Sequence, residues 1–152
     1  MTRFEIDFET RCSPERTIAA LTDFSDRRTR IWPGLAPEFY EVYSVEETSA
    51  EVREGSTKPT RVWAKEHYDW STPGTVRWTV RESNFCTPGS GVSVDVSPGE
   101  GGGSRVHLVW ERHPSNAKGR MMIVVMKLFG PKILRGYCTK SLDAYAATAA
   151  AA

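Results

Sequence analysis

Four polar residues fall on the apolar sides of segments that otherwise alternate, and their types suit acid–base chemistry. They are Glu66, Glu82, Ser90 and Arg112. A carboxyl group in apolar surroundings keeps its proton to higher pH, and two that face each other titrate separately. A guanidinium beside them could hold an enolate or carboxylate oxygen. If these side chains meet in one cavity, with Tyr68 as a further candidate, they suit dehydration or aldol-type cyclisation.

The segments that carry these residues show the two-residue alternation of half-buried strands. Four segments show it: 60–70, 75–83, 91–97 and 104–113. Charged residues take the odd numbers, so the even-numbered side faces inward, because charges must keep their solvent. Paired residues of antiparallel strands share a face, which limits the register. The predicted pairs are Trp70 with Trp78, Tyr68 with Val80, Glu66 with Glu82, Glu82 with Ser90, Val94 with Leu108, Val92 with Trp110, and Ser90 with Arg112.

This register places the four polar residues in one row, where Glu82 could reach Arg112 over the small Ser90. The alternative interpretation is a solvated rim at the open end of the sheet, or an ordinary ion-pair network of little energetic value. The separation of the Glu66 and Glu82 carboxyl groups decides between them. Carboxyl groups more than about 8 Å apart, or on the outer face, would exclude a shared acid–base site.

Aromatic rings gather on the same inward side and predict the wall of an apolar cavity. Rings of this kind also form ordinary cores, but so many on one face, under a helix with adaptable methionines, suit a flat apolar ligand. The predicted ligand-contacting residues are Phe8, Trp32, Tyr68, Trp70, Trp78, Trp110, Met122, Met126 and Phe129. Trp32, beside Pro33 and Gly34, is also expected to pack at the junction of two short helices.

The remaining segments must position these side chains. Residues 3–11 alternate as a first strand, and Ser13-Pro14-Glu15 and Thr22-Asp23 begin two short helices. Six further strands are predicted: 39–46, 50–56, 60–70, 75–83, 91–97 and 104–113. The pattern predicts an α+β helix-grip fold, in which a seven-stranded curved antiparallel sheet wraps around a long C-terminal helix. We expect one domain over residues 1–147 and a frayed tail over 148–152.

The C-terminal helix is expected from Asn116, as N-cap, to Ala147. Gly130-Pro131 interrupts the run, and a mid-helix proline predicts a kink. We expect the half from Met122 to Phe129 to lie over the polar row as a lid. The half from Ile133 to Tyr145 should pack on the sheet and the short helices.

Composition excludes several classes of function. The chain has 20 Lys and Arg against 19 Asp and Glu, so its net charge produces no overall positive potential that would favour binding of nucleic acid. Its three cysteines form no CxxC pair, its histidines lack metal-ligand spacing, and its glycine-rich loop lies between two strands, so no metal or cofactor is expected. We expect a cytoplasmic monomer or homodimer without stable membrane insertion. Surface binding of an anionic membrane through Lys118, Arg120 and Lys127 is an alternative role for the basic helix.

Several stretches resemble one known group of proteins. They are Ser13-Pro14-Glu15, Thr22-Asp23-Phe24, Ile31-Trp32-Pro33-Gly34, and Glu66-His67-Tyr68-Asp69-Trp70-Ser71 with Pro73-Gly74. Together with the order of elements, they resemble the START-related SRPBCC superfamily, in its bacterial polyketide cyclase/dehydrase branch. The resemblance implies a helix-grip fold that binds apolar or polycyclic small molecules between sheet and helix. Some members are cyclases or dehydratases and others are carriers, and no catalytic set can be transferred to this sequence.

We therefore expect a small hydrophobic ligand, including polycyclic or lipid-like molecules, in an internal cavity between the sheet and the C-terminal helix. The alternative is a polyketide cyclase or dehydratase that uses Glu66, Glu82, Tyr68 and Arg112. A third interpretation is an interaction module whose interior is filled by its own side chains. An enclosed space of roughly 300 Å³ would favour a ligand over this third interpretation.

Overall fold

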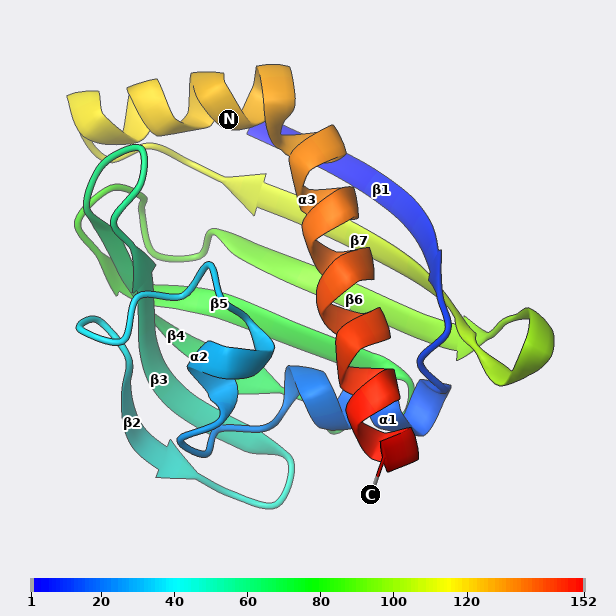
Figure 1. The fold of residues 1–152 in the computed structure, drawn as a ribbon. Helices are drawn as coiled ribbons and strands as arrows, with labels where there is room; N and C mark the ends of the chain where they lie inside the picture. The colour runs from blue at the N-terminus through cyan, green and yellow to red at the C-terminus, as the bar shows by residue number, and fades with distance from the viewer. Residues whose placement is uncertain (1, 152) are drawn as a thin grey trace.

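A curved antiparallel sheet is crossed on one face by a long helix (Figure 1). The computed structural model describes residues 2–151. Within that range the strands are β1 (Thr2–Thr10), β2 (Glu41–Val45), β3 (Ser49–Ser56), β4 (Val62–Asp69), β5 (Thr75–Ser83), β6 (Gly91–Pro98) and β7 (Ser104–Arg112). They pair in the order β1-β7-β6-β5-β4-β3-β2. The helices are α1 (Pro14–Leu21), α2 (Arg28–Ile31), the short 3-10 helix η1 (Glu100–Gly102) and α3 (Ala117–Ala151).

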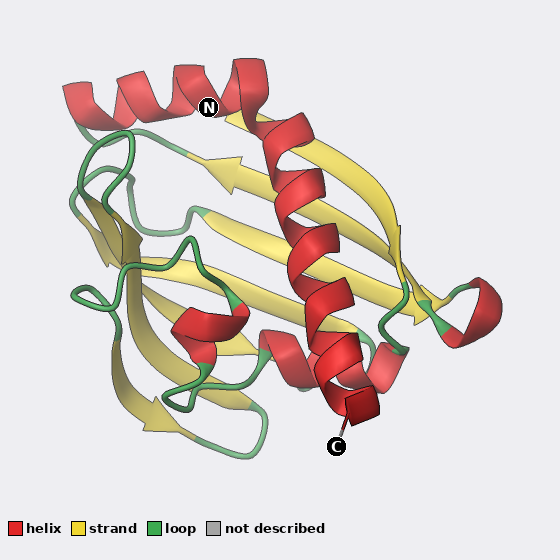
Figure 2. Ribbon diagram, in the orientation of Figure 1, coloured by secondary structure: helices red, strands yellow, loops and turns green. Residues whose placement is uncertain are grey.

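This architecture confirms the predicted α+β helix-grip fold. Figure 2 shows the short helices α1 and α2 on the same side of the sheet as α3. The core lies between them and the sheet, and it contains Ile6, Val76, Val94 and Leu142. Helix α3 continues to Ala151, and Ala152 lies outside the described residues, so the predicted fraying of the tail is not tested there.

The strands alternate as predicted, with even-numbered residues inward. In β4, the side chains of Val62, Ala64, Glu66 and Tyr68 are buried, and their odd-numbered neighbours are more exposed. Strand β7 follows the same rule from Ser104 to Arg112. The alternation holds because each strand has one face on the core and one on solvent. The inward direction predicted for Glu66 and Arg112 is therefore confirmed.

The register is confirmed between β6 and β7 and is wrong between β4 and β5. It is also wrong between β5 and β6, where Val80 and not Glu82 lies opposite Ser90. Val94 pairs with Leu108 and Val92 with Trp110, as predicted. Across the other hairpin, Tyr68 pairs with Trp78 and Glu66 with Val80, so the true register is two residues away from the predicted one. A slip of two residues keeps every side chain on its expected face, so alternation alone could not detect it.

A β-bulge next to this pairing changes the face of Glu82. Between the pairs Glu66–Val80 and Lys65–Glu82, strand β5 contains the additional residue Arg81. One extra residue reverses the alternation of the strand beyond it. Glu82 is consequently paired with an outward-facing residue and is exposed to solvent.

The connection between β1 and β2 begins with a capped helix. Ser13 Oγ accepts a hydrogen bond from the Arg16 amide at 3.3 Å, and Pro14 is the first helical residue. The second helix is shorter than predicted and begins only at Arg28, after a turn in which Asp23 Oδ1 accepts from the Ser25 amide at 3.0 Å. This turn and α2 carry Arg28 over the sheet.

Helix α3 begins where expected and is bent. Asn116 Oδ1 accepts a hydrogen bond from the Gly119 amide at 2.9 Å, which confirms the N-cap. Figure 1 shows the helix turning sharply about midway, and Pro131 is the proline inside it. The first half extends along one end of the sheet, and the second half crosses the sheet face. No helix in the described range is both long and apolar enough to cross a membrane.

The two halves of α3 bury different amounts of apolar surface. From the second half, Leu134, Tyr137, Cys138 and Leu142 belong to the core or pack against it, as predicted for this segment. In the first half, Met122 and Ile123 are buried. Several of its other apolar side chains are exposed: Leu128 at 68%, Phe129 at 57% and Met121 at 48%. This half therefore packs on the core with Met122 and Ile123 and leaves other apolar side chains open to solvent, and the lid over the polar row stays a prediction.

Candidate functional site

A cavity of about 280 Å³ lies between the sheet and the second half of α3. Strands β1 and β3 to β7, both short helices and α3 contribute to its lining. Five of the predicted ligand-contacting residues line it: Phe8, Trp32, Tyr68, Trp78 and Trp110. From α3, Leu134, Tyr137, Cys138 and Leu142 complete the wall. That these side chains contact a ligand remains a prediction.

The other predicted ligand-contacting residues lie away from the cavity lining. Trp70 follows the last residue of β4 and packs near Phe24, with the ring centroids 5.9 Å apart. Met122, Met126 and Phe129 belong to the first half of α3 and are not among the lining residues, although Met122 is buried and Met126 packs against the core. None of these four residues is part of the cavity lining, and their contact with a ligand stays a prediction.

Aromatic rings form flat parts of the cavity wall. Tyr68 and Trp78, directly paired across β4 and β5, stack at 5.0 Å with an interplanar angle of 22°. Trp110 stacks on Phe4 of the neighbouring strand at 4.9 Å. Stacked cross-strand rings provide broad apolar surface at fixed positions. The wall is therefore suited in shape to a flat ligand body.

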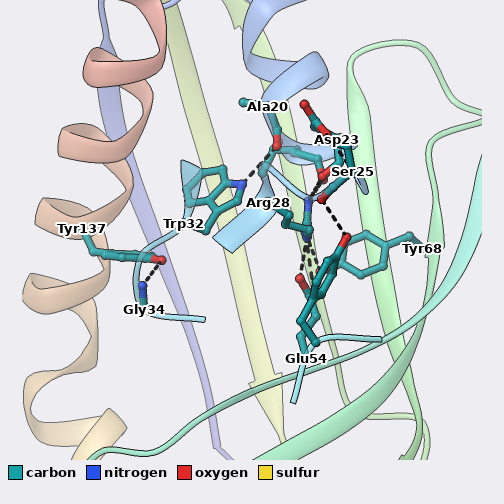
Figure 3. Close-up of polar contacts among 11 residues, drawn as sticks. Ala20, Asp23, Ser25, Arg28, Trp32, Gly34, Glu54, Tyr68 and Tyr137 are labelled. Atoms are coloured by element: carbon teal, nitrogen blue, oxygen red, sulfur yellow. Dashed lines mark hydrogen bonds and ion pairs between the residues drawn. The ribbon is translucent and has the colours of Figure 1, made fainter. Parts of the chain in front are cut away.

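Two hydrogen bonds fix the helical side of the cavity (Figure 3). The indole nitrogen of Trp32 donates to the Ala20 carbonyl at 3.0 Å, which packs this ring against α1 as predicted. The Tyr137 hydroxyl accepts from the Gly34 amide at 3.0 Å. The second half of α3 is thereby tied to the segment that follows α2, and this wall is held in place by polar contacts as well as by packing.

A buried ion pair joins α2 to β3 and contacts Tyr68 (Figure 3). Arg28 Nε donates to Glu54 Oε2 at 2.5 Å, and Arg28 Nη2 donates to the Tyr68 hydroxyl at 3.1 Å. Arg28 Nη1 donates to the carbonyls of Leu21 at 3.0 Å and Asp23 at 3.2 Å. The Tyr68 hydroxyl in turn donates to Glu54 Oε1. Every nitrogen of the guanidinium has a partner, so this pair is satisfied by the protein.

The surroundings of Tyr68 make it a hydrogen-bond donor and not a base. Burial, together with the adjacent Glu54 carboxylate, raises the pKa of Tyr68 well above its ordinary value of 10. The phenol therefore remains protonated near neutral pH. Its proton is already donated to Glu54, which leaves it a structural role in the wall of the cavity.

Sequence reasoning missed both members of this buried pair. Glu54 lies at an even position of the segment 50–56, after Ala50 and Val52, so the rule applied to the later strands would have placed it inward. Arg28 gives no comparable signal, because it lies in a short helix without periodicity. Its contact with Glu54 spans 26 residues and depends on the tertiary fold.

A second buried pair, Glu66 and Arg112, lines the cavity without hydrogen bonding to each other. Glu66 is 5% exposed and Arg112 is 8% exposed. Arg112 Nη2 lies 3.7 Å from Glu66 Oε2, which allows an ion pair but is too long for a hydrogen bond. Burial raises the pKa of Glu66 to about 7, against the opposing effect of the Arg112 charge. The carboxyl group can therefore both give and take a proton near neutral pH.

The predicted pairing of Glu66 with Glu82 is wrong. The bulge in β5 turns Glu82 toward solvent, so it cannot share a site with the inward-facing Glu66. Ser90 is buried, and its hydroxyl accepts a hydrogen bond from the His113 amide at 2.9 Å. Of the charged residues in the predicted polar row, Glu66 and Arg112 form an ion pair.

The histidines pair with carboxylates at half-buried or exposed positions. His67 Nδ1 lies 2.6 Å from Glu51 Oε1, and His107 Nδ1 lies 2.8 Å from Asp7 Oδ1. Across residues 2–151, no group of three or more His, Cys, Asp or Glu side chains could hold a metal ion.

Fold and cavity together define a protein of the helix-grip class. The chain belongs to the family described as polyketide cyclase/dehydrase and lipid transport, whose sequence profile matches residues 1–150. This membership confirms the resemblance read from the sequence. No protein among those with curated functions matches the chain.

Solved structures of several helix-grip proteins are similar to this chain. A protein from Thermus thermophilus, TTHA0849, superposes with a TM-score of 0.77 at 16% identity, over 97% of this chain and 99% of the other. A START superfamily protein from Mycobacterium smegmatis gives 0.75 at 10%, over 96% and 97%. The Zhui aromatase/cyclase from Streptomyces sp. R1128 gives 0.75 at 9%, over 95% and 93%. At these identities the similarity establishes the fold alone.

Proposed function

We propose that this protein binds a small hydrophobic ligand with a flat or polycyclic body in the cavity between the sheet and the second half of α3. The observation that carries the proposal is a space of about 280 Å³ whose walls are mostly aromatic and aliphatic. Protein interiors are close-packed, and voids much larger than a water molecule are few. A cavity of this size, near the lower end of the range for ligand sites, argues against an interior filled by its own side chains.

The construction of the cavity also supports a ligand. The stacked Tyr68 and Trp78 rings offer a flat face, and their positions are fixed by strand pairing and by the Arg28 network. A preformed apolar pocket binds without the entropic cost of ordering its own walls. The family description names polyketide cyclases, dehydrases and lipid transport. The ligands that this description implies, polyketides and lipids, share an extended or flat apolar body.

Filling the cavity tests this proposal. Val106 of β7 lines the cavity, whereas Val109 lies on the other face of the same strand. The probe is N-phenyl-1-naphthylamine, whose fluorescence rises in apolar surroundings. We expect saturable binding to the wild type, about tenfold or more weaker binding to Val106→Phe, because the added ring occupies ligand space, and unchanged binding to Val109→Phe. Circular dichroism confirms that both variants are folded. No saturable binding, or equal affinity in both variants, contradicts the proposal.

The second candidate function is that of a cyclase or dehydratase. It is favoured by one specific observation, that the pKa of Glu66 is raised to about 7 by burial beside a cavity-lining arginine. Glu66 would remove and return protons on the substrate carbon chain, and Arg112 would stabilise the enolate oxygen that develops. Tyr68 would contribute to substrate positioning.

A pH profile tests this second candidate. With a linear β-polyketone as model substrate, we expect ring closure to depend on pH with an inflection near 7, where Glu66 changes its protonation state. Glu66→Gln should abolish that inflection and lower the rate by about 100-fold or more, the usual range for loss of a general acid or base. A rate equal to that of the buffer, or one that is unaffected in Glu66→Gln, excludes this role.

A further inference from the structure

The two buried ion pairs of the cavity differ in how completely the protein satisfies them. Glu66 of β4 and Arg112, the last residue of β7, both line the cavity. Oε2 of Glu66 and Nη1 of Arg112 are buried, and neither has a hydrogen-bond partner among the residues described. The large majority of buried side-chain polar atoms in proteins have such a partner, so two unpaired atoms on one pair require an explanation.

The Arg28–Glu54 pair provides an internal comparison. It lines the same cavity, and its guanidinium nitrogens are all used by Glu54, Tyr68 and two backbone carbonyls. The fold is therefore able to complete a buried pair at this depth. A half-satisfied buried pair is costly, because desolvation is incurred without the compensating hydrogen bonds.

Neighbouring groups do not supply the missing bonds. The Cys86 thiol lies in the field of both Glu66 and Arg112, and burial raises its pKa, so it stays neutral. Its Sγ contacts Ser83 Oγ at 3.4 Å. The Glu54 carboxylate and the Tyr68 hydroxyl, which also face this region, are committed to Arg28. The protein therefore leaves this buried pair incomplete, and both side chains line the cavity.

We propose that Glu66 and Arg112 form a subsite for a hydroxyl group at one end of the hydrophobic ligand, which donates to the Glu66 carboxylate and accepts from the Arg112 guanidinium. This inference rests on the proposed ligand binding and specifies its chemistry. The ligand is then an alcohol or a phenol with a flat apolar body. The aromatic wall holds the body, and the ion pair fixes its orientation.

A hydroxyl group matches the Glu66 carboxylate and the Arg112 guanidinium better than other head groups. It is both a donor and an acceptor, so one group can serve the carboxylate and the guanidinium. A ligand carboxylate would place a second negative charge beside Glu66, and an ammonium would place a second positive charge beside Arg112. A purely apolar end would leave both polar atoms buried without partners, which costs more than a missing contact.

Three probes that share one ring body separate these possibilities. They are 2-naphthol, which donates and accepts, 2-methoxynaphthalene, which only accepts, and 2-methylnaphthalene, which does neither. Their dissociation constants are measured by equilibrium dialysis at pH 8, above the pKa of about 7 to which burial raises Glu66. We expect the naphthol to bind the wild type about tenfold or more tightly than the methyl compound, with the methoxy compound between them.

The double variant Glu66→Leu/Arg112→Met removes the subsite and keeps the cavity. Replacing a whole buried pair by apolar residues is often neutral or stabilising, whereas removing one member leaves a buried charge. We expect this variant to bind 2-methylnaphthalene at least as tightly as the wild type and to lose the preference for the naphthol. The control is Glu9→Leu/Arg105→Met, the same change at an exposed pair 3.4 Å apart on the outer face, which should keep the preference.

The outcomes separate the subsite from the cavity. If the three probes bind the wild type equally, or if the double variant retains the preference for the naphthol, the subsite is wrong and the cavity proposal stands. Equal binding is the result expected if ordered water completes the pair. If none of the probes binds, both the subsite and the binding of a flat hydrophobic ligand are wrong. If the double variant is unfolded by circular dichroism, Glu66→Leu replaces it, and an unchanged preference for the naphthol over the methoxy compound then contradicts the subsite, because only the naphthol can donate to Glu66.

Discussion

Glu66 has almost no contact with solvent, and its charge state responds to pH near neutrality. Burial raises its pKa from an ordinary value of 4.5 to about 7. The folded protein therefore binds more protons at this group than the unfolded chain does between pH 4.5 and 7. The contribution of Glu66 to stability is fully present below the lower value and is lost as the pH rises through the upper one.

The variant Glu66→Gln should remove this dependence on pH. Each pKa unit corresponds to 1.36 kcal/mol, so the difference in unfolding free energy between Glu66→Gln and wild type should shift by about 3 kcal/mol in favour of the variant from pH 4 to pH 8. Urea unfolding at both pH values measures it. Glu82→Gln, at the exposed carboxyl of the adjacent strand, is the control and should show a nearly constant difference. A constant difference for Glu66→Gln as well would contradict the assigned burial.

The residues of the site were accessible to sequence reasoning to different degrees. Alternation placed Glu66, Tyr68 and Arg112 on the inward face, because each strand has one side that faces solvent and one that faces the core. The same rule would have found Glu54. The rule failed for Glu82, because a bulge adds a single residue to β5 and reverses the face on which the following side chains lie. The local sequence pattern does not indicate this bulge.

At the scale of the element, α3 combines two roles in one continuous helix. Gly130-Pro131 correctly indicated the bend, because proline removes a backbone hydrogen bond and clashes with the preceding turn. The direction of the bend follows from what each half packs against. The second half is tied to Gly34 through Tyr137 and closes the cavity, whereas the first half covers the end of the sheet with Ile123 and leaves Leu128 exposed.

Alanine substitutions in the first half of α3 test this division. Ile123 is 6% exposed, and Ile123→Ala should lower the unfolding free energy by about 2–4 kcal/mol through lost burial and a residual cavity. Leu128 is 68% exposed, so Leu128→Ala, the matched change later in the same half, should alter it by less than about 0.5 kcal/mol. Chemical denaturation measures both. Comparable losses would show that the first half packs on both of its sides.

At the scale of the whole molecule, the sheet curves around a space that the chain does not fill. Its concave face meets α1, α2 and the second half of α3, and their contacts with the sheet hold the walls apart. The aromatic rings and the satisfied Arg28–Glu54 pair fix the shape of that space. The Glu66–Arg112 pair, which lacks hydrogen-bond partners, forms a polar part of the cavity wall. The proposed ligand binding and the proposed hydroxyl subsite both depend on this arrangement.

Sequence alone was sufficient for the class of fold, the order of its elements, the inward faces of the strands and the bend in α3. These follow from local effects, since alternation, helix capping and a mid-helix proline act over a few residues. The β4–β5 register, the exposure of Glu82 and the contact between Arg28 and Glu54 emerged only in three dimensions. Registers two residues apart present identical faces, and a contact across 26 residues depends on how the chain closes, so neither leaves a local signal.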